Sequence, residues 1–264
     1  MIGNWTIPDE RPDTAERKIP HFLRIRDDLA SKMESGELPT QTRLPSEREL
    51  SDSYRITRMT VRQALRQLEA EGLIYRLDRR GWFVSPSRLR YNPTANIGFT
   101  ENVRSQGKVP GTLLLSKEMI PASSWATKYL AVTEGEPVFL IRRLRSIDDR
   151  AVLVEQLYVN ATRCPELLEL PLEQSLTDLL EKHYGIVERR VRITMRPTAL
   201  NEVQAQALQV AVGTPGLYLT RTILDQYDNV IEFDQEFWRH DVLEVEVDTY
   251  TDGGVTVSRS AGNK

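Results

Sequence analysis

The chain has 264 residues, 40% of them hydrophobic, and a formal net charge of -3. That length is long for one domain and ordinary for two, so we expect two separate hydrophobic cores. No apolar run is long enough to span a membrane, the first residues do not resemble a signal peptide, and one cysteine with three scattered histidines offers neither a disulfide framework nor zinc-ligand spacing. The sequence therefore predicts a cytoplasmic protein without a metal ion or another cofactor.

The charge is unevenly distributed along the chain. Residues 18–90 contain 15 basic and 10 acidic residues, a net charge of +5 within a chain that is negative overall. A basic segment of this kind suggests a phosphate backbone as partner. An ordinary fluctuation of surface charge is the alternative, and the elements expected in the same segment decide between the two.

Three helices are expected in this basic segment. Residues 20–33 carry apolar side chains at helical spacing, which predicts the first helix. Ser46 precedes two glutamates and can cap a short second helix that ends near Tyr54. Thr57 can cap a third helix, which Gly72 ends because glycine tolerates a positive φ. One face of this third helix is apolar and the other is basic, so one face can pack while the other contacts DNA.

A basic hairpin follows the third helix. Leu73–Arg76 and Trp82–Val84 are extended apolar segments, joined through Asp78-Arg79-Arg80-Gly81. A helix pair followed by such a hairpin is the order of a winged helix-turn-helix, whose recognition helix enters the major groove of DNA.

The DNA-contacting residues follow from this arrangement. We assign base edges to the start of the third helix, phosphate to the start of the second, and a minor groove to the hairpin tip. For any single arginine, a solvated surface charge is the alternative. The predicted DNA-binding residues are Arg48, Thr57, Arg58, Thr60, Arg62, Arg80 and Gly81.

Beyond Ser85–Pro93 the pattern changes to alternating apolar and polar residues with short turns. The expected strands are Val138–Ile147, Ala151–Val159, Val191–Pro197, Leu217–Leu224, Val230–Trp238 and Leu243–Thr249. The expected helices are Phe99–Gln106, Ser124–Leu130, Ser175–His183 and Asn201–Leu208. The fold class is therefore α+β, with a helical head followed by a mostly antiparallel sheet.

The chain divides accordingly into five parts. A flexible arm, 1–17, precedes a winged helix-turn-helix domain, 18–85. A linker, 86–95, leads to a sheet domain, 96–250, and a flexible tail, 251–264, ends the chain.

A weak internal repeat is visible in the sheet domain. Leu130–Glu155 and Leu208–Glu232 share a helix end, a Gly-x-Pro turn, a strand containing an arginine, and a hairpin. Arg143 and Arg221 fall at equivalent positions of the two units. Two such units predict a pseudo-symmetric sheet with a cleft between its halves, where ligand pockets are common. The alternative is that common turn chemistry produced two similar hairpins.

The head resembles a known family. Leu44–Leu50, Thr60–Leu65, Glu71–Ile74 and Gly81–Val84 are close to the signature of the GntR family of bacterial transcription regulators, over about seventy residues. The resemblance implies a winged helix-turn-helix that binds operator DNA. The sequence departs from the family pattern at Arg55, where glycine is frequent, and at residues 79–82 and 39–40.

The second half is similar to the UTRA sensor domain of the HutC branch of that family, whose fold also resembles chorismate lyase. Its markers include Phe99-Thr100-Glu101, Gly135-x-Pro137-Val138, Arg143-x-Arg145 and Trp238-Arg239-His240-Asp241. The two arginines alternate along one strand and so face the same side, where they can clamp a phosphonate, phosphate or carboxylate. An ion-pair ladder on the sheet surface is the alternative for these arginines.

The remaining site residues follow from this resemblance. Ser175 and Thr177 open a helix whose amides assist anion binding. Thr100 takes a matching position in the helix expected at Phe99–Gln106. Glu155 and Glu232 are left for the other end of the ligand, although inward carboxylates of this kind can instead neutralise the two arginines. Trp238 stands where relatives usually have tyrosine and forms a wall of the site. The predicted effector-binding residues are Thr100, Arg143, Arg145, Glu155, Ser175, Thr177, Glu232 and Trp238.

A narrower likeness points to regulators of 2-aminoethylphosphonate utilisation. It rests on Asp78–Val84, Arg88–Thr94, Phe237–Asp241 and Glu246–Thr249. It implies a small anionic or zwitterionic effector such as 2-aminoethylphosphonate. We expect a homodimer, because a palindromic site in double-stranded DNA needs two recognition helices, and a repressor that the effector releases, since repression is the commoner mode of the family. The same regulator answering to an amino-sugar phosphate or a urocanate-like carboxylate is one alternative.

Two further alternatives belong to other classes of protein. A lyase-like enzyme acting on a small carboxylate is the first, but the chain has no nucleophile elbow, phosphate loop or His-Glu metal motif, so we expect no enzymatic activity. The second is an architectural DNA-binding protein without a ligand, against which the Arg-x-Arg pair argues.

Overall fold

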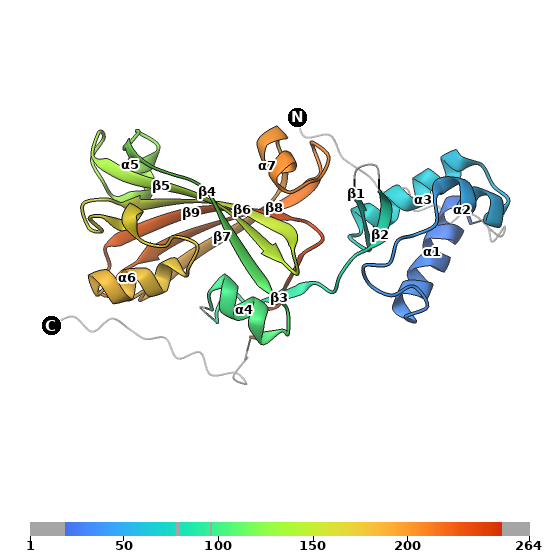
Figure 1. Cartoon of the computed structure of the whole chain (residues 1–264), viewed down its shortest axis with the longest axis horizontal. Helices are drawn as coiled ribbons and strands as arrows, with labels where there is room; N and C mark the ends of the chain where they lie inside the picture. The colour runs from blue at the N-terminus through green and yellow to red at the C-terminus, as the bar shows by residue number, and fades with distance from the viewer. Residues whose placement is uncertain (1–18, 78–79, 96, 250–264) are drawn as a thin grey trace, which may run out of the picture. The chain divides into compact units, whose positions relative to one another are not determined.

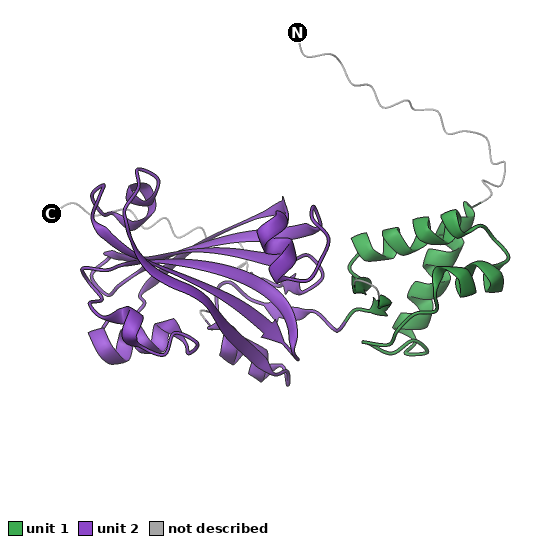
Figure 2. Ribbon diagram, turned by 45° about the horizontal axis from the view of Figure 1, so that its top comes forward, with its two compact units in different colours: residues 1–85 green, residues 86–264 purple. Residues whose placement is uncertain are grey.

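The computed structural model describes residues 19–77, 80–95 and 97–249. The chain forms two compact units, of which unit 1 ends at Ser85 and unit 2 begins at Pro86 (Figure 2). The expected arm and tail, together with Asp78 and Arg79 of the expected hairpin, lie outside the described residues. Unit 1 combines helices with a two-stranded hairpin and unit 2 contains a six-stranded antiparallel sheet, which confirms the α+β class. Within the described part of the chain, no helix is both long and apolar enough to cross a membrane.

Unit 1 contains the three helices and the hairpin in the expected order (Figure 1). Its elements are α1 (His21–Glu34), α2 (Glu47–Tyr54), α3 (Arg58–Ala70), β1 (Ile74–Leu77) and β2 (Gly81–Val84). Both predicted caps form, because the Ser46 side chain accepts a hydrogen bond from the Glu49 amide, and that of Thr57 accepts one from the Thr60 amide. The apolar stripe of α3 packs against α1 in a single core.

Arg55, at the end of α2, departs from the family pattern and has a left-handed backbone, with φ 54°. A side chain with a Cβ costs about 1–2 kcal/mol in this region, so Arg55→Gly should raise the free energy of unfolding of unit 1 by up to about 1 kcal/mol after the larger chain entropy of glycine is deducted. Urea unfolding of the full chain measures the change. Arg66→Gly inside α3 is the control and should lower stability by about 1 kcal/mol. Destabilisation by both changes would contradict the backbone argument.

Unit 2 is built on one sheet with the strand order β4-β5-β6-β9-β8-β7, all neighbours antiparallel. Its strands are β3 (Leu89–Tyr91), β4 (Pro110–Pro121), β5 (Pro137–Ile147), β6 (Arg150–Asn160), β7 (Arg190–Ala199), β8 (Pro215–Leu224), β9 (Val230–Arg239) and β10 (Leu243–Val245). Its helices are α4 (Phe99–Ser105), α5 (Ala126–Leu130), η1 (Leu167–Glu169), α6 (Leu176–Tyr184) and α7 (Glu202–Ala207).

The weak sequence repeat corresponds to a repeated series of helices and strands. The series α4-β4-α5-β5-β6 recurs as α6-β7-α7-β8-β9, and the two halves meet where β6 pairs with β9. Alternation along the strands gives the sheet two apolar faces. One packs against α4 and α6, and the other against α5 and α7. The equivalent positions of Arg143 and Arg221 therefore lie in the centre of the two halves, on the α4 and α6 side.

Among the strands, three segments differ from the sequence prediction. The edge strand β4, Pro110–Pro121, was not expected. The expected linker, 86–95, contains β3, which pairs in parallel with β10 and buries Leu89 in the core beside Trp238. Of the extended segment expected at Leu243–Thr249, only Leu243–Val245 is a strand, because β3 offers a partner to these three residues alone.

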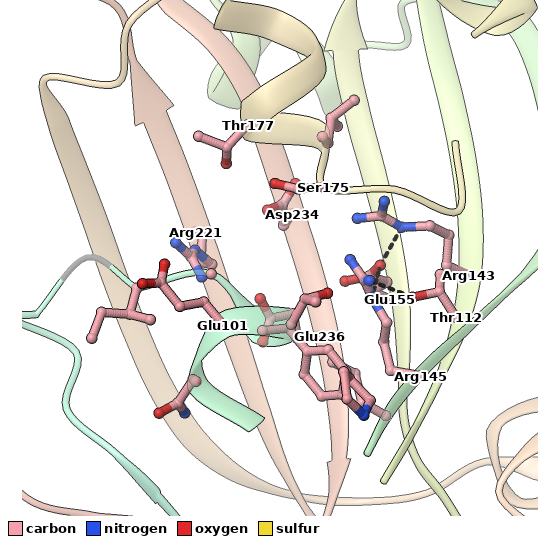
Figure 3. A pocket seen from close by; sticks show the side chains of 18 of the residues that line it. Glu101, Thr112, Arg143, Arg145, Glu155, Ser175, Thr177, Arg221, Asp234 and Glu236 are labelled. Carbon is pink, nitrogen blue, oxygen red and sulfur yellow. Dashed lines mark hydrogen bonds and ion pairs between the residues drawn. The ribbon is translucent and has the colours of Figure 1, made fainter. Parts of the chain in front are cut away.

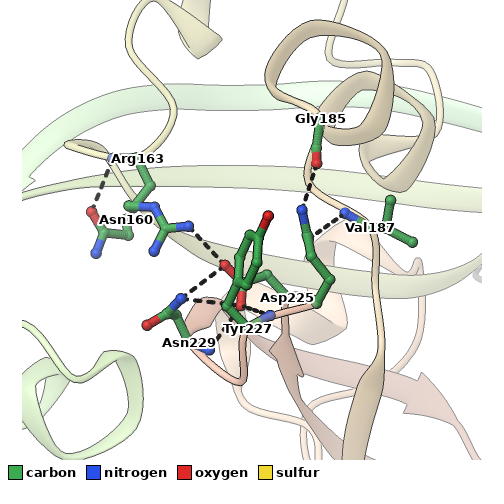
Figure 4. Close-up of polar contacts among 8 residues, drawn as sticks. Asn160, Arg163, Gly185, Val187, Asp225, Tyr227 and Asn229 are labelled. Carbon is green, nitrogen blue, oxygen red and sulfur yellow. Dashed lines mark hydrogen bonds and ion pairs between the residues drawn. The ribbon is translucent and has the colours of Figure 1, made fainter.

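The turn between β8 and β9 fastens the far end of α6 to the sheet (Figure 4). Asp225 is fully buried, accepts hydrogen bonds from two backbone amides of its own turn, and pairs with Arg163 at 2.7 Å. Gln226 donates to the Gly185 carbonyl at 2.9 Å and accepts from the Val187 amide at 3.0 Å. These contacts hold α6 in a fixed position over the same face of the sheet as α4.

Candidate functional site

The start of α3 presents the residues predicted to contact DNA. Arg58 is exposed and, among the described residues, makes no hydrogen bond or ion pair through its side chain. Arg62 is held by Glu47 of α2, with two Nε contacts of 3.1 and 3.2 Å and an Nη2 contact of 2.7 Å to the carboxylate. The Arg62 guanidinium keeps the pKa of Glu47 below its usual value. The hydroxyls of Thr57 and Thr60 lie 2.9 Å apart and bond to each other. Arg58 is therefore the predicted base-reading side chain left available.

The other predicted DNA contacts lie on α2 and at the hairpin. Arg48 is exposed, 3.9 Å from Asp52. Arg80 lies over the Phe83 ring at 5.7 Å. Gly81 has φ 97°, a backbone conformation that favours glycine, and the missing side chain lets the backbone approach a partner closely.

A cavity of about 960 Å³ in unit 2 brings together all eight predicted effector-binding residues. Its floor is the sheet face that β5, β6, β8 and β9 share, and its rim includes residues of α4 and α6 (Figure 3). A volume of this size is typical of a pocket for a small organic ligand.

One side of the cavity holds a buried cluster of two arginines and one carboxylate (Figure 3). Arg143 and Arg145 both donate through Nε to Oε1 of Glu155, the second at 2.7 Å. Arg143 also donates to the carbonyls of Leu172 and Gln174, at 3.0 and 3.1 Å. Burial alone would raise the pKa of Glu155, but the two arginines outweigh it and hold that pKa below its usual value. Glu155 thus neutralises the arginines, as the alternative for this residue anticipated, and one positive charge is left over.

The helix residues and Trp238 surround this cluster. Ser175 caps α6 by accepting from the Asp178 amide at 3.3 Å, and the Thr177 hydroxyl donates to Glu188 at 2.7 Å. Thr100 is half-buried in the first turn of α4. Trp238 is a buried wall whose Nε1 donates to Glu236 at 2.7 Å. Both hydroxyls of α6 are thus already used within the protein.

Several charged residues that line the cavity were missing from the predicted set. Glu232, which was predicted, is followed at every second position of β9 by Asp234 and Glu236, all buried on the cavity face. Arg221 on β8 and Glu188 complete the group. The period of two along β9 and the repeat position of Arg221 were the available signals. Among the described residues, no cluster of histidine, cysteine and acidic side chains is arranged to hold a metal ion.

The acidic row on β9 is buried enough to change its ionisation. Burial raises the pKa of Glu232 to about 7 and raises those of Asp234 and Glu236 as well. Folding therefore favours the protonated acids. For Glu232, the contribution to stability is complete below pH 4.5 and is lost as the pH rises through about 7.

The resulting prediction concerns stability against pH. Between pH 5 and pH 8 the free protein should lose stability, on the order of 3 kcal/mol for a shift of this size at one buried group. Glu232→Gln cannot ionise and should flatten that slope. Urea unfolding of both forms at several pH values measures it. A variant that loses stability over this range as steeply as the wild type would contradict the role of Glu232.

Comparison with known proteins finds a matching family model for each of the two units. Residues 22–84 match the model for bacterial regulatory proteins of the gntR family, and residues 105–244 match that for the UTRA domain. The HTH-type transcriptional repressor NagR of Bacillus subtilis is 31% identical over 84% of this chain and 92% of its own length. The HTH-type transcriptional regulator GgaR of Escherichia coli is 30% identical over 86% and 90%. The crystal structure of PhnF from Mycobacterium smegmatis matches with a TM-score of 0.61 and 27% identity, over 86% of this chain and 99% of that one.

These relatives carry the names of transcription regulators, which excludes the lyase-like enzyme. The two matched families also account for both units in their order along the chain. The chain therefore belongs to the GntR family of bacterial transcription regulators, with an N-terminal DNA-binding unit and a C-terminal UTRA domain.

Proposed function

We propose that the protein is a repressor released from operator DNA by a small effector that carries an anionic group and an ammonium group, such as 2-aminoethylphosphonate. The observation that carries this proposal is the charge pattern of the cavity. The arginine cluster retains one uncompensated positive charge, while the row on β9 presents three buried acids. The former suits a phosphonate, phosphate or carboxylate and the latter suits an ammonium group.

The acids of β9, rather than Glu155, bind the ammonium end of the effector. The oxygen that Glu155 turns toward Arg143 and Arg145 is already used, whereas Oδ1 of Asp234 is buried without a partner. We therefore assign the ammonium end of the effector to Asp234 and Glu232. Arg143 and Arg145 keep the anionic end, and Ser175 and Thr177 at the start of α6 line the same cavity.

The path from cavity to DNA-binding unit runs through α4 and β3. Gln106, just after α4, accepts from the Arg90 amide and donates to the Arg90 carbonyl, both at 2.9 Å, and Asn102 donates to the same carbonyl at 3.1 Å. β3 is the strand of unit 2 that lies nearest to unit 1 along the chain. We infer that an effector that moves α4 changes the position of β3 and, through residues 86–88, the spacing of two recognition helices in a homodimer bound to a palindromic site.

Calorimetry of the full chain tests the effector. 2-Aminoethylphosphonate, an amino-sugar phosphate and urocanate are titrated separately, and the compound that binds is then added to a complex of the protein with the duplex DNA it selects from random sequences. Binding of the first compound with release of the DNA is the expected result. Heat with either of the others and none with 2-aminoethylphosphonate would reject the phosphonate, and a bound complex that any binding compound leaves unchanged would reject release.

A further inference from the structure

Arg143 and Arg221 occupy equivalent positions in the two halves of the sheet. Each lies at the same offset from the start of its strand, β5 or β8. Each also stands opposite a carboxylate on the next strand, because Arg143 pairs in register with Glu155 and Arg221 pairs with Asp234. All four residues line the cavity. The repeated fold therefore sets the same arginine–carboxylate pair twice over one cavity.

Only in the first of these two pairs does the arginine bond to the opposite carboxylate. Arg143 donates to Glu155, and both side chains are buried. Among the described residues, Arg221 makes no hydrogen bond or ion pair through its side chain, and its Nε is buried without a partner. Asp234 is 5% exposed and shares a side-chain hydrogen bond with Glu232, but its Oδ1 is also buried and unpartnered. Since buried polar groups in proteins nearly always have partners, this open pair calls for a ligand.

We propose that Arg221 and Asp234 form a subsite for the head group of an α-amino acid, with the guanidinium binding the carboxylate and Asp234 binding the ammonium group. An amino acid carries these two charges on one carbon, and directly opposed residues of neighbouring strands have Cβ atoms about 5 Å apart, so both side chains can reach groups on that carbon. The inference rests on the proposed function, because it uses the same cavity. It names the effector class as an amino acid whose distal anionic group reaches Arg143 and Arg145.

The size of the cavity and the charges around Arg221 favour such a ligand. About 960 Å³ holds a molecule larger than a two-carbon zwitterion. Burial alone would lower the pKa of Arg221, but the negative charges of Glu236, Asp234 and Glu188 raise it, so the guanidinium stays charged. A carboxylate gives this charge a bidentate partner, and the adjacent ammonium favours the ionised form of Asp234, whose pKa burial raises in the free protein. The head group as a whole brings no net charge into the buried site.

A pair of compounds that differ by one carboxylate tests the subsite. 2-Amino-3-phosphonopropionate is 2-aminoethylphosphonate with a carboxylate added on the carbon that bears the amine. In calorimetry with the full chain, the carboxylate should tighten binding at least about tenfold, as one or two charge-assisted hydrogen bonds do. Arg221→Met should abolish this advantage, so that the two compounds bind the variant with equal affinity. Asp234→Asn should weaken binding of both compounds, and Arg196→Met, on β7 outside the cavity, should change neither.

The other outcomes of this calorimetry separate failure of the subsite from failure of the phosphonate effector. Equal affinities of the two compounds, or an advantage that survives Arg221→Met, would overturn the amino-acid subsite and leave the proposed function standing. Absence of heat with both compounds would overturn the phosphonate effector and the subsite together. Arg221→Met replaces a partly buried charge without a hydrogen-bond partner by an apolar side chain, so the variant should fold, and its circular dichroism melt verifies this. Arg221→Lys keeps the charge without the planar fork and should retain only part of the advantage.

Discussion

Glu155→Gln should lower the free energy of unfolding of unit 2 by about 3–5 kcal/mol, the usual cost of removing one partner from a buried ion pair. The substitution keeps the shape of the side chain and removes its charge. Arg143 and Arg145, 2% and 5% exposed, are then left as two positive charges without a counterion. The carbonyls that bond Arg143 and the Thr112 hydroxyl that bonds Arg145 carry no charge to replace it.

Urea unfolding of the full chain, followed by circular dichroism, measures this loss. Glu118→Gln is the matched control, because Glu118 pairs with Arg142 at 2.6 Å and both side chains are exposed. Exposed pairs contribute at most about 1 kcal/mol, so the control should remain close to wild type. Inorganic phosphate should restore part of the stability of Glu155→Gln, since an anion between the arginines replaces the lost charge. Equal, small effects of both substitutions would show that Glu155 is not the counterion.

The sequence allowed Glu155 or Glu232 to neutralise the two arginines, but it could not predict which of the two does so. A period of two along the strand is enough to place Arg143 and Arg145 on one face. Which carboxylate stands opposite them depends on the register of β5 and β6, and a bulge next to Arg145 shifts that register. The alternation pattern contains no information on such a shift. The same limit hid the opposition of Arg221 and Asp234, which exists only once β8 and β9 are paired.

Two strands, β4 and β3, were not predicted, each for a different physical reason. A bulge between Leu114 and Ser116 interrupts the alternation of β4, so this edge strand has no regular pattern. β3 is three residues long and pairs with a strand some 150 residues later, which no local signal can indicate. The capped helices of unit 1 were predictable because their signals, Ser46 before two glutamates and Thr57 before an apolar stripe, lie within a few residues of the structure they determine.

Arg58→Ala and Arg145→Met should separate the two functions of the protein. Arg58 is exposed at the start of α3 and its side chain has no partner among the described residues, so it is available to grip a base. Its loss should weaken binding to the selected duplex by about 1–3 kcal/mol, or roughly 5- to 150-fold, and leave binding of 2-aminoethylphosphonate unchanged. Arg62→Ala should cost less than this, because part of the Arg62 guanidinium is committed to Glu47.

Arg145→Met should have the opposite effect. It leaves Arg143 and Glu155 as one balanced pair, so unit 2 keeps its fold, but the uncompensated positive charge of the cluster is gone. Operator affinity should be retained, while binding of 2-aminoethylphosphonate weakens about 10- to 100-fold, and release from DNA is lost in proportion. Fluorescence anisotropy of the labelled duplex, with and without the compound, reads both properties in one titration. For Arg58→Ala, the control is Arg24→Ala on the exposed side of α1, which also removes one positive charge from unit 1. If Arg145→Met were released from DNA at the wild-type effector concentration, the arginine cluster would not be the anionic end of the site.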